Sequence, residues 1–183
     1  MMSRLPLIEI PEPLDAHIKA LGGKPLNLYR ALSHNPRLLE SWIDFAYTLR
    51  DGKTPRRLRE LMILRTAQMA HSAYELAQHS IMAKKAGVTE NEIAELENWQ
   101  QSTLFNDIEK AALKLTEAIV NNHMTDDIYA NAAQYFSHVD MIELLLTASF
   151  YCMVPRFLNA IAITTEGESS LQYRKMADNL LAF

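Results

Sequence analysis

The chain contains little cysteine, glycine or proline: one cysteine, five glycines and seven prolines in 183 residues. A single cysteine excludes an intrachain disulfide and a C-x-x-C redox pair within these residues. Few glycines and prolines disfavour a sandwich or barrel built of many short strands, whereas long stretches of Ala, Leu, Met, Glu and Gln favour helices. The composition therefore predicts an all-α fold.

An excess of positive charge is also absent, since the formal net charge is -4. Without a basic field we expect no nucleic acid partner. The most apolar stretch, 144–154, is far shorter than the ~20 residues that span a bilayer, so we expect a buried helix and no membrane. Residues 1–9 lack a signal-peptide core, and we expect a cytoplasmic protein.

Helix start and stop signals are frequent along the chain, and no repeat or linker divides it. We expect one domain, 1–183, with an irregular N-terminal arm at 1–10. Asn35-Pro36 and Thr54-Pro55 resemble N-caps followed by proline in the first helical position. Short connections favour an antiparallel or orthogonal bundle. The predicted helices are 36–50, 56–69, 72–86, 90–100, 107–121, 126–136, 139–153 and 169–181.

Two of these helices carry ionisable residues on apolar stripes. Glu75 and His79 share one stripe of the helix that begins at Ser72, and Glu60 shares a stripe with apolar residues of the preceding helix. A hairpin at 70–71 would bring Glu60 to His79, and a carboxylate on an imidazole fixes its tautomer and raises its basicity. The spacing predicts a proton-transfer pair with Glu75 and the adjacent tyrosine nearby.

Simpler interpretations of the same residues remain open at this point. Ser72 and Glu75 have the spacing of a capping box and need do nothing but cap the helix. Glu75 and His79, four residues apart, can form a purely stabilising helix contact. Spacing alone leaves the function undecided.

Three runs, RELMILRTA at 59–67, YELAQH at 74–79 and AGVTENEI at 86–93, together resemble the carboxymuconolactone decarboxylase family. They match its glutamate–leucine helix, its Tyr-Glu-x-x-x-His helix start and its Ala-Gly turn. The core of the resemblance covers about 58–96, and a looser match extends it to about 33–124. The resemblance implies the helical domain of the carboxymuconolactone decarboxylase and AhpD-like superfamily.

In the similar AhpD-like branch, two cysteines open the site helix and act with a glutamate and a histidine. Aligned without gaps, Ser72 and Glu75 stand at the cysteine positions, while Glu60 and His79 match the glutamate and the histidine. A serine hydroxyl cannot pass through a sulfenic acid or a disulfide, so AhpD-like peroxidase or disulfide-reductase activity is disfavoured. A redox protein that uses Cys152 is an alternative, although apolar surroundings raise a thiol pKa and favour an inert cysteine.

The resemblance implies a cofactor-free acid–base enzyme, a carboxymuconolactone decarboxylase-like lyase, acting on a small organic acid or lactone. His79, tuned by Glu60, would move the proton, and Glu75 or Tyr74 would position the substrate. Ser72 and Arg156 are the candidate substrate-binding residues, Arg156 as a carboxylate anchor unless it forms a structural ion pair. We expect no cofactor and no metal, because one histidine and two glutamates make a poor zinc set.

A different class of function is a non-catalytic helical oligomer that binds a ligand. In that case Glu60 and His79 are structural partners only. The resemblance also implies a homo-oligomer, a trimer or a hexamer, and the apolar region 141–163 would serve either an interface or a monomer core.

Overall fold

The computed structural model describes residues 3–166, and within them the chain is helical and contains no strand. The prediction of an all-α fold is confirmed. The elements are α1 (Glu12–Ala20), α2 (Asn27–Leu32), α3 (Pro36–Arg50), α4 (Arg56–Met69), α5 (Ala73–Lys85), α6 (Glu90–Glu95), the 3-10 turn η1 (Leu96–Asn98), α7 (Asp107–Val120), α8 (Asp126–Ala133) and α9 (His138–Ala160).

Most helix ends lie where the sequence signals placed them. Asn35 caps α3 by accepting a hydrogen bond from the backbone N–H of Leu38, and Thr89 forms a capping box at the start of α6. Gly87 follows α5 with a φ of 88°, a left-handed conformation that favours glycine. The predicted Thr54 cap is wrong, because Pro55 is the N-cap of α4 and makes no side-chain cap bond. The backbone N–H of Thr54 instead donates to a carboxylate of α9.

Other differences lie at the two ends of the chain. Helices α1 and α2 were not predicted, while residues 3–10 are irregular as expected. Helix α9 continues through Pro155 to Ala160 instead of ending near Met153. At 23 residues it is long and apolar enough to cross a bilayer by length and composition, but half of its most apolar window is buried inside the fold, as in core helices of soluble proteins. The predicted helix 169–181 lies outside the described residues.

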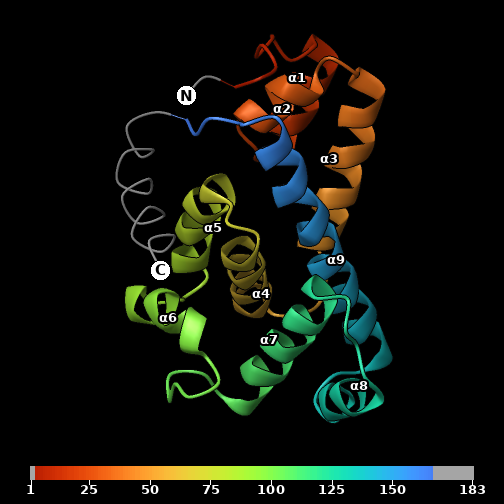
Figure 1. Ribbon diagram of the computed structural model, residues 1–183. Helices are drawn as coiled ribbons and strands as arrows, with labels where there is room; N and C mark the ends of the chain where they lie inside the picture. Colours follow the sequence, from red (N-terminus) through yellow and green to blue (C-terminus); the bar gives the residue numbers. More distant parts are fainter. Residues whose placement is uncertain (1–2, 167–183) are drawn as a thin grey trace.

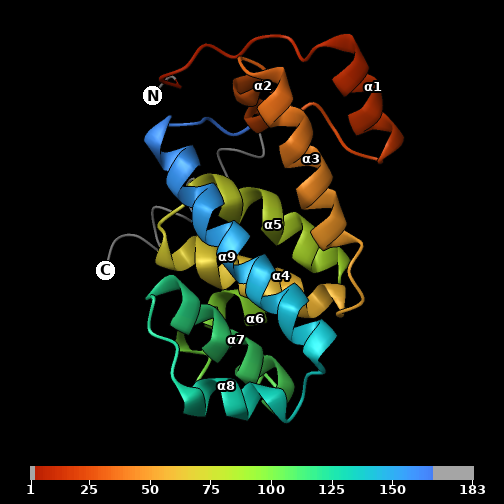
Figure 2. The same cartoon turned by 90° about the vertical axis from the view of Figure 1, so that its right-hand side faces the viewer.

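Helix α4 occupies the centre of the fold, packed against α5, α7 and α9 (Figures 1 and 2). Nine of its fourteen residues are buried, so its buried side chains lie around most of the helix and not along a single stripe. Its apolar side chains enter three clusters: Ile63 packs with α1–α3 and the end of α9, Leu61 and Leu64 pack with α5–α7, and Leu58 and Met62 pack with α7–α9. The charged residues of α4 consequently need partners inside the protein.

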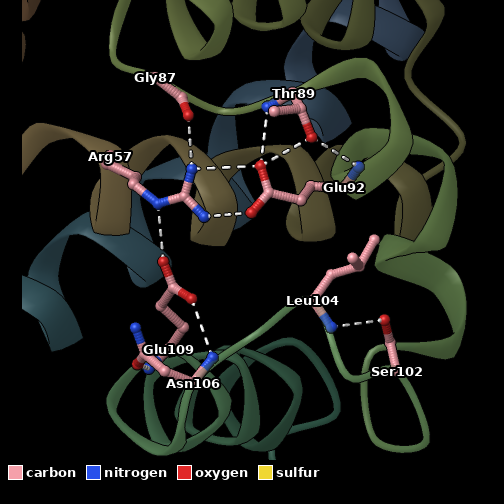
Figure 3. Close-up of polar contacts among 8 residues, drawn as sticks. All are labelled: Arg57, Gly87, Thr89, Glu92, Ser102, Leu104, Asn106 and Glu109. Carbon is pink, nitrogen blue, oxygen red and sulfur yellow. Dashed lines mark hydrogen bonds and ion pairs between the residues drawn. The ribbon is translucent and has the colours of Figure 1, made fainter.

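Arg57 joins α4 to the starts of α6 and α7 (Figure 3). Its Nε donates to Glu109 at 2.8 Å, and its Nη atoms bond to Glu92 and, at 2.6 Å, to the carbonyl of Gly87. Glu92 and Glu109 are also the third-position residues of the capping boxes of α6 and α7. Arg57 first, and then hydrogen bonds from Thr89, lower the pKa of Glu92 to about 2 and more than offset the effect of its burial.

We expect Arg57→Met to lower the free energy of unfolding by about 3 kcal/mol at pH 7, because it leaves two buried carboxylates without their cation. The pKa of Glu92 is lower in the folded protein than its unfolded value of 4.5, so its ionised form stabilises the fold at pH values above 4.5. This contribution is lost as the pH falls toward about 2. Urea unfolding measured between pH 7 and pH 3 should therefore show the difference from wild type shrinking below about pH 4.5. Arg156→Met, which replaces an exposed arginine, is the control. If the difference in unfolding free energy between Arg57→Met and wild type did not change with pH, the role given to the Arg57–Glu92 pair would be wrong.

Candidate active site

Glu60 and His79 meet between α4 and α5. His79 Nδ1 lies 2.8 Å from Glu60 Oε2, and the two residues are only 7% and 5% exposed. The turn between the helices passes through His71, which has a left-handed φ of 51°, so α5 folds back along α4 and faces it. The structure thus brings together the two residues that the helix stripes and the family resemblance had singled out.

Glu75 lies on the other side of the same imidazole. Its Oε2 is 3.5 Å from His79 Nε2 and has no hydrogen-bond partner among the described residues. Ser72 caps α5 by accepting a hydrogen bond from the backbone N–H of Glu75 at 3.4 Å, but the carboxylate of Glu75 points to the histidine. Capping therefore accounts for Ser72, which is fully buried away from the cavities, and does not account for the Glu75 side chain.

The three ionisable groups shift one another's proton affinity. Burial alone lowers the pKa of His79, but the charge and hydrogen bond of Glu60, together with the charge of Glu75, raise it overall. Burial raises the pKa of Glu60, yet His79 and Arg56 lower it overall. The pKa of Glu75 is raised, because its burial and the charge of Glu60 outweigh the attraction of His79. The site therefore favours an ionised Glu60, a protonated His79 and a Glu75 that readily takes up a proton.

A cavity of about 200 Å³ opens beside the Glu60–His79 pair. Thr147 and Tyr151, one turn apart on α9, form another wall, and the Tyr151 ring meets the His79 ring edge to face at a centroid distance of 5.0 Å. Thr147 is 2% exposed and its hydroxyl has no partner among residues 3–166, so it is available to a bound molecule. The remaining lining residues are Leu21, Tyr47, Leu49, Arg50, Asp51, Arg56, Arg59 and Ile63.

Only one of the three arginines at this cavity is without a local anionic or carbonyl partner. Arg59 donates to the backbone carbonyls of Leu49 and Arg50, and Arg56 pairs with Glu60 at 3.4 Å. Arg50 lies over the Tyr47 ring at 4.8 Å and makes no ion pair with a described carboxylate. Its guanidinium is therefore the cationic group available to an anionic ligand.

A smaller cavity of about 50 Å³ is also lined by the imidazole. His79, Arg50 and Tyr151 line both cavities, whereas Glu75 and Tyr74 line only the smaller one. The Tyr74 hydroxyl lies 2.7 Å from a carboxylate oxygen of Glu166, and its pKa is raised first by burial and then by Glu166. Tyr74 therefore lies near His79 but outside the larger cavity.

The structure does not bring Arg156 to the site. Arg156 is exposed, lines neither cavity and donates to the carbonyl of Cys152 in its own helix. It follows Tyr151 by five residues, which turns its side chain by ~140° away from the cavity face of α9. Cys152 is partly buried outside both cavities; burial raises its thiol pKa, although Arg156 opposes the shift.

Sequence reasoning missed the residues that form the far walls of the cavity. Thr147 and Tyr151 carry a readable signal, since two polar groups four residues apart interrupt the apolar run on one helical face. Tyr47 and Arg50 lack such a signal, because nothing local shows that the end of α3 reaches α5. Within the described part of the chain, no cluster of three histidine, cysteine or carboxylate side chains could hold a metal ion.

Comparisons with known proteins agree with this architecture. The sequence pattern of the Carboxymuconolactone decarboxylase family matches residues 36–118, which contain Glu60, Glu75 and His79. An uncharacterized protein of Bacillus subtilis (strain 168), YdfG, is 27% identical over 114 residues, or 61% of this chain and 78% of YdfG.

Solved structures share the fold at low identity. An uncharacterized peroxidase-related protein from Ralstonia eutropha JMP134, described as an AhpD core, superposes with a TM-score of 0.80 at 16% identity over 95% of this chain and 97% of its own. The debrominase Bmp8, as a cysteine-to-alanine variant in complex with 2,3,4-tribromopyrrole, superposes with a TM-score of 0.73 at 21% identity over 91% and 90%. Residues 36–118 thus carry the pattern of the Carboxymuconolactone decarboxylase family, and the chain shares the fold of an AhpD core; together they support the superfamily that the sequence resemblance implied.

Proposed function

We propose that the chain is a cofactor-free acid–base enzyme, a carboxymuconolactone decarboxylase-like lyase that acts on a small carboxylated or lactone substrate. The observation that carries the proposal is the imidazole of His79, held between two buried carboxylates at the wall of a cavity of about 200 Å³. Such a site can move a proton in surroundings from which most water is excluded.

His79 is the proton donor in this proposal. Ionised Glu60 holds Nδ1 and raises the pKa of the imidazole, so His79 keeps its proton near neutral pH until a stronger base forms in the cavity. A carbanion conjugated with a carbonyl group is such a base. Glu75, next to Nε2 and with its own pKa raised, can return a proton to the imidazole.

Arg50 takes the anchoring role that the sequence had suggested for Arg156. Its guanidinium attracts the anionic substrate and stabilises negative charge on the carbonyl oxygen as the reaction proceeds. The bond between the ring carbon and the carboxylate breaks, carbon dioxide leaves, and the electron pair stays on the ring carbon. His79 protonates this carbon and is then reprotonated from water through Glu75.

The size of the cavity favours a compact substrate. In the debrominase Bmp8, which shares the fold, the bound molecule is a small substituted ring, 2,3,4-tribromopyrrole. A cavity of about 200 Å³ suits a ring of that order with one or two polar substituents. A small carboxylated lactone belongs to this size class.

A peroxidase or disulfide reductase is the less favoured alternative. The chain has one cysteine, and Cys152 lies outside both cavities with a raised pKa. The peroxidase-related neighbours are 16% identical, so they support the fold and not the activity. A non-catalytic ligand-binding protein is the remaining alternative; in it the Glu60–His79 pair would only stabilise the helices.

We also propose that the protein is a homo-oligomer. Four apolar side chains on α9, Val139, Ile142, Leu146 and Met153, are 42–60% exposed and follow one another at helical spacing along one stripe. Exposed Ser149 interrupts this stripe between Leu146 and Met153, but its apolar side chains still favour a protein interface, and a second copy of the chain would cover them.

The His79 pKa tests the proton-transfer pair. We expect Glu60→Gln to lower the His79 pKa, because it removes the charge and weakens the hydrogen bond that raise this pKa. Histidine NMR titrations of the wild type and the variant measure the shift, and Glu97→Gln, an exposed substitution, should leave it unchanged. If the His79 pKa does not fall, the pairing is wrong and the non-catalytic alternative becomes the better one.

Turnover tests the catalytic role of His79. Among small carboxylated lactones, we expect one that releases carbon dioxide with the wild type, and we expect His79→Asn to reduce kcat by about 100-fold or more. His71→Asn is the matched control, since His71 is exposed and its left-handed φ of 51° suits asparagine. Arg50→Met should raise KM and also lower kcat, because Arg50 both attracts the substrate and stabilises the charge that develops during the reaction. Equal turnover by His79→Asn and wild type would contradict the mechanism.

Light scattering coupled to size-exclusion chromatography tests the oligomer. We expect a mass that is a multiple of 20.9 kDa for the wild type, and a shift toward 20.9 kDa in Ile142→Glu, because a charge on the apolar stripe is costly to bury. Ile108→Glu, an exposed isoleucine on α7 away from the stripe, should keep the wild-type mass. A monomeric wild type would end this part of the proposal.

A further inference from the structure

A carboxylate of the chain itself is bound beside the smaller cavity. After α9 the chain passes α2 and the N-terminal end of α5 (Figure 1), and Glu166 reaches donors of both. Its Oε1 accepts from the backbone N–H of Asn27 at 2.5 Å and from the Tyr74 hydroxyl at 2.7 Å. Its Oε2 accepts from the Gln78 side-chain amide at 2.5 Å. Both carboxylate oxygens are therefore hydrogen-bonded.

The donors form a site that would persist without Glu166. Tyr74 is 4% exposed, and its hydroxyl is held in place by a second hydrogen bond, 3.4 Å from the backbone N–H of Leu28. Gln78 lies one turn later on α5, so the hydroxyl and the amide project from the same face. No lysine, arginine or histidine in residues 3–166 pairs with Glu166, so three neutral donors hold this carboxylate.

This site adjoins the acid–base residues. Tyr74 and Gln78 alternate along α5 with Glu75 and His79, and all four line the cavity of about 50 Å³. Leu26 and Leu28 of the neighbouring chain segment add apolar lining. A short carboxylate bound to the same donors would place its hydrocarbon part next to the His79 imidazole.

We propose that the Asn27 N–H, the Tyr74 hydroxyl and the Gln78 amide form a binding site for small monocarboxylates, which Glu166 occupies as an internal competitor. Tyr74 and Gln78 line the smaller cavity and not the cavity of the proposed function, and the occupancy of the site can be measured without any catalytic activity. An external carboxylate binds when Glu166 leaves.

Tethering makes Glu166 an effective competitor. A group linked to its site through the chain acts at an effective concentration on the order of millimolar or higher. A short free carboxylate, with few contacts in so small a cavity, binds weakly by itself and is excluded until it approaches that concentration. Removal of the Glu166 side chain should therefore increase its apparent affinity while leaving the three donors in place.

Propionate titrations of the full chain test the proposal, with the backbone amide of Asn27 and the side-chain amide of Gln78 followed by ¹H–¹⁵N NMR. We expect Glu166→Ala to lower the apparent Kd for propionate at least about tenfold relative to wild type, because the competitor is gone. Glu97→Ala, which removes an exposed carboxylate elsewhere, should bind propionate as the wild type does.

Two further variants identify the donors. Adding Tyr74→Phe to Glu166→Ala should weaken propionate binding at least about fivefold, since the ring stays and only the hydroxyl is lost. Gln78→Leu in the same background should weaken it in the same way. The proposal is overturned if Glu166→Ala binds propionate no more tightly than wild type, or if neither donor variant weakens the binding. A His79 pKa unchanged in Glu166→Ala shows that the acid–base site is intact, so this result is independent of the proposed function.

Discussion

The burial of Glu60 in the central helix is the constraint on which the site depends. Helix α4 packs against α5, α7 and α9, and Glu60 is 5% exposed within it. A buried carboxylate without a partner is strongly unfavourable, so Glu60 needs a partner inside the fold. His79 on α5 supplies the main partner at 2.8 Å, with Arg56 at 3.4 Å as a half-exposed second cation. The packing of α5 on α4 and the tuning of the imidazole therefore follow from the same contact.

The sequence predicted this contact because both partners lie in consecutive helices with clear ends. Glu60 and His79 are 19 residues apart, joined by a turn too short to permit another arrangement of the two helices. The far walls of the cavity depend on long-range packing instead. Arg156 was predicted as a carboxylate anchor from its residue type alone, but α9 continues through Pro155 and places Arg156 on a face turned away from the cavity. Arg50 lies at the correctly predicted end of α3, yet no local pattern shows which helix that end meets.

The two positions that match cysteines of the AhpD-like branch have separate roles in this chain. Ser72 is fully buried and caps α5, a role that needs only a hydroxyl near the first turn. Glu75 places an unpaired carboxylate oxygen 3.5 Å from His79. A hydroxyl and a carboxylate cannot store electrons, whereas a carboxylate with a raised pKa can store a proton. These substitutions favour proton transfer over thiol chemistry on an unchanged helical frame.

His79 lines two cavities, and the two carboxylates beside it differ in proton affinity. Glu60 lines the larger cavity and has a lowered pKa, while Glu75 lines the smaller cavity and has a raised one. When the pKa values of two neighbouring groups are shifted in opposite directions, the directions indicate which group keeps its charge and which exchanges protons. In the proposed function, Glu60 is the fixed charge that keeps the imidazole protonated, and Glu75 is the group that exchanges protons with it. In the proposed mechanism Nδ1 keeps its proton and its hydrogen bond to Glu60, so the proton that His79 gives up is the one on Nε2. Glu75, 3.5 Å from Nε2, can replace that proton on the same nitrogen, so the imidazole need not turn between the two steps.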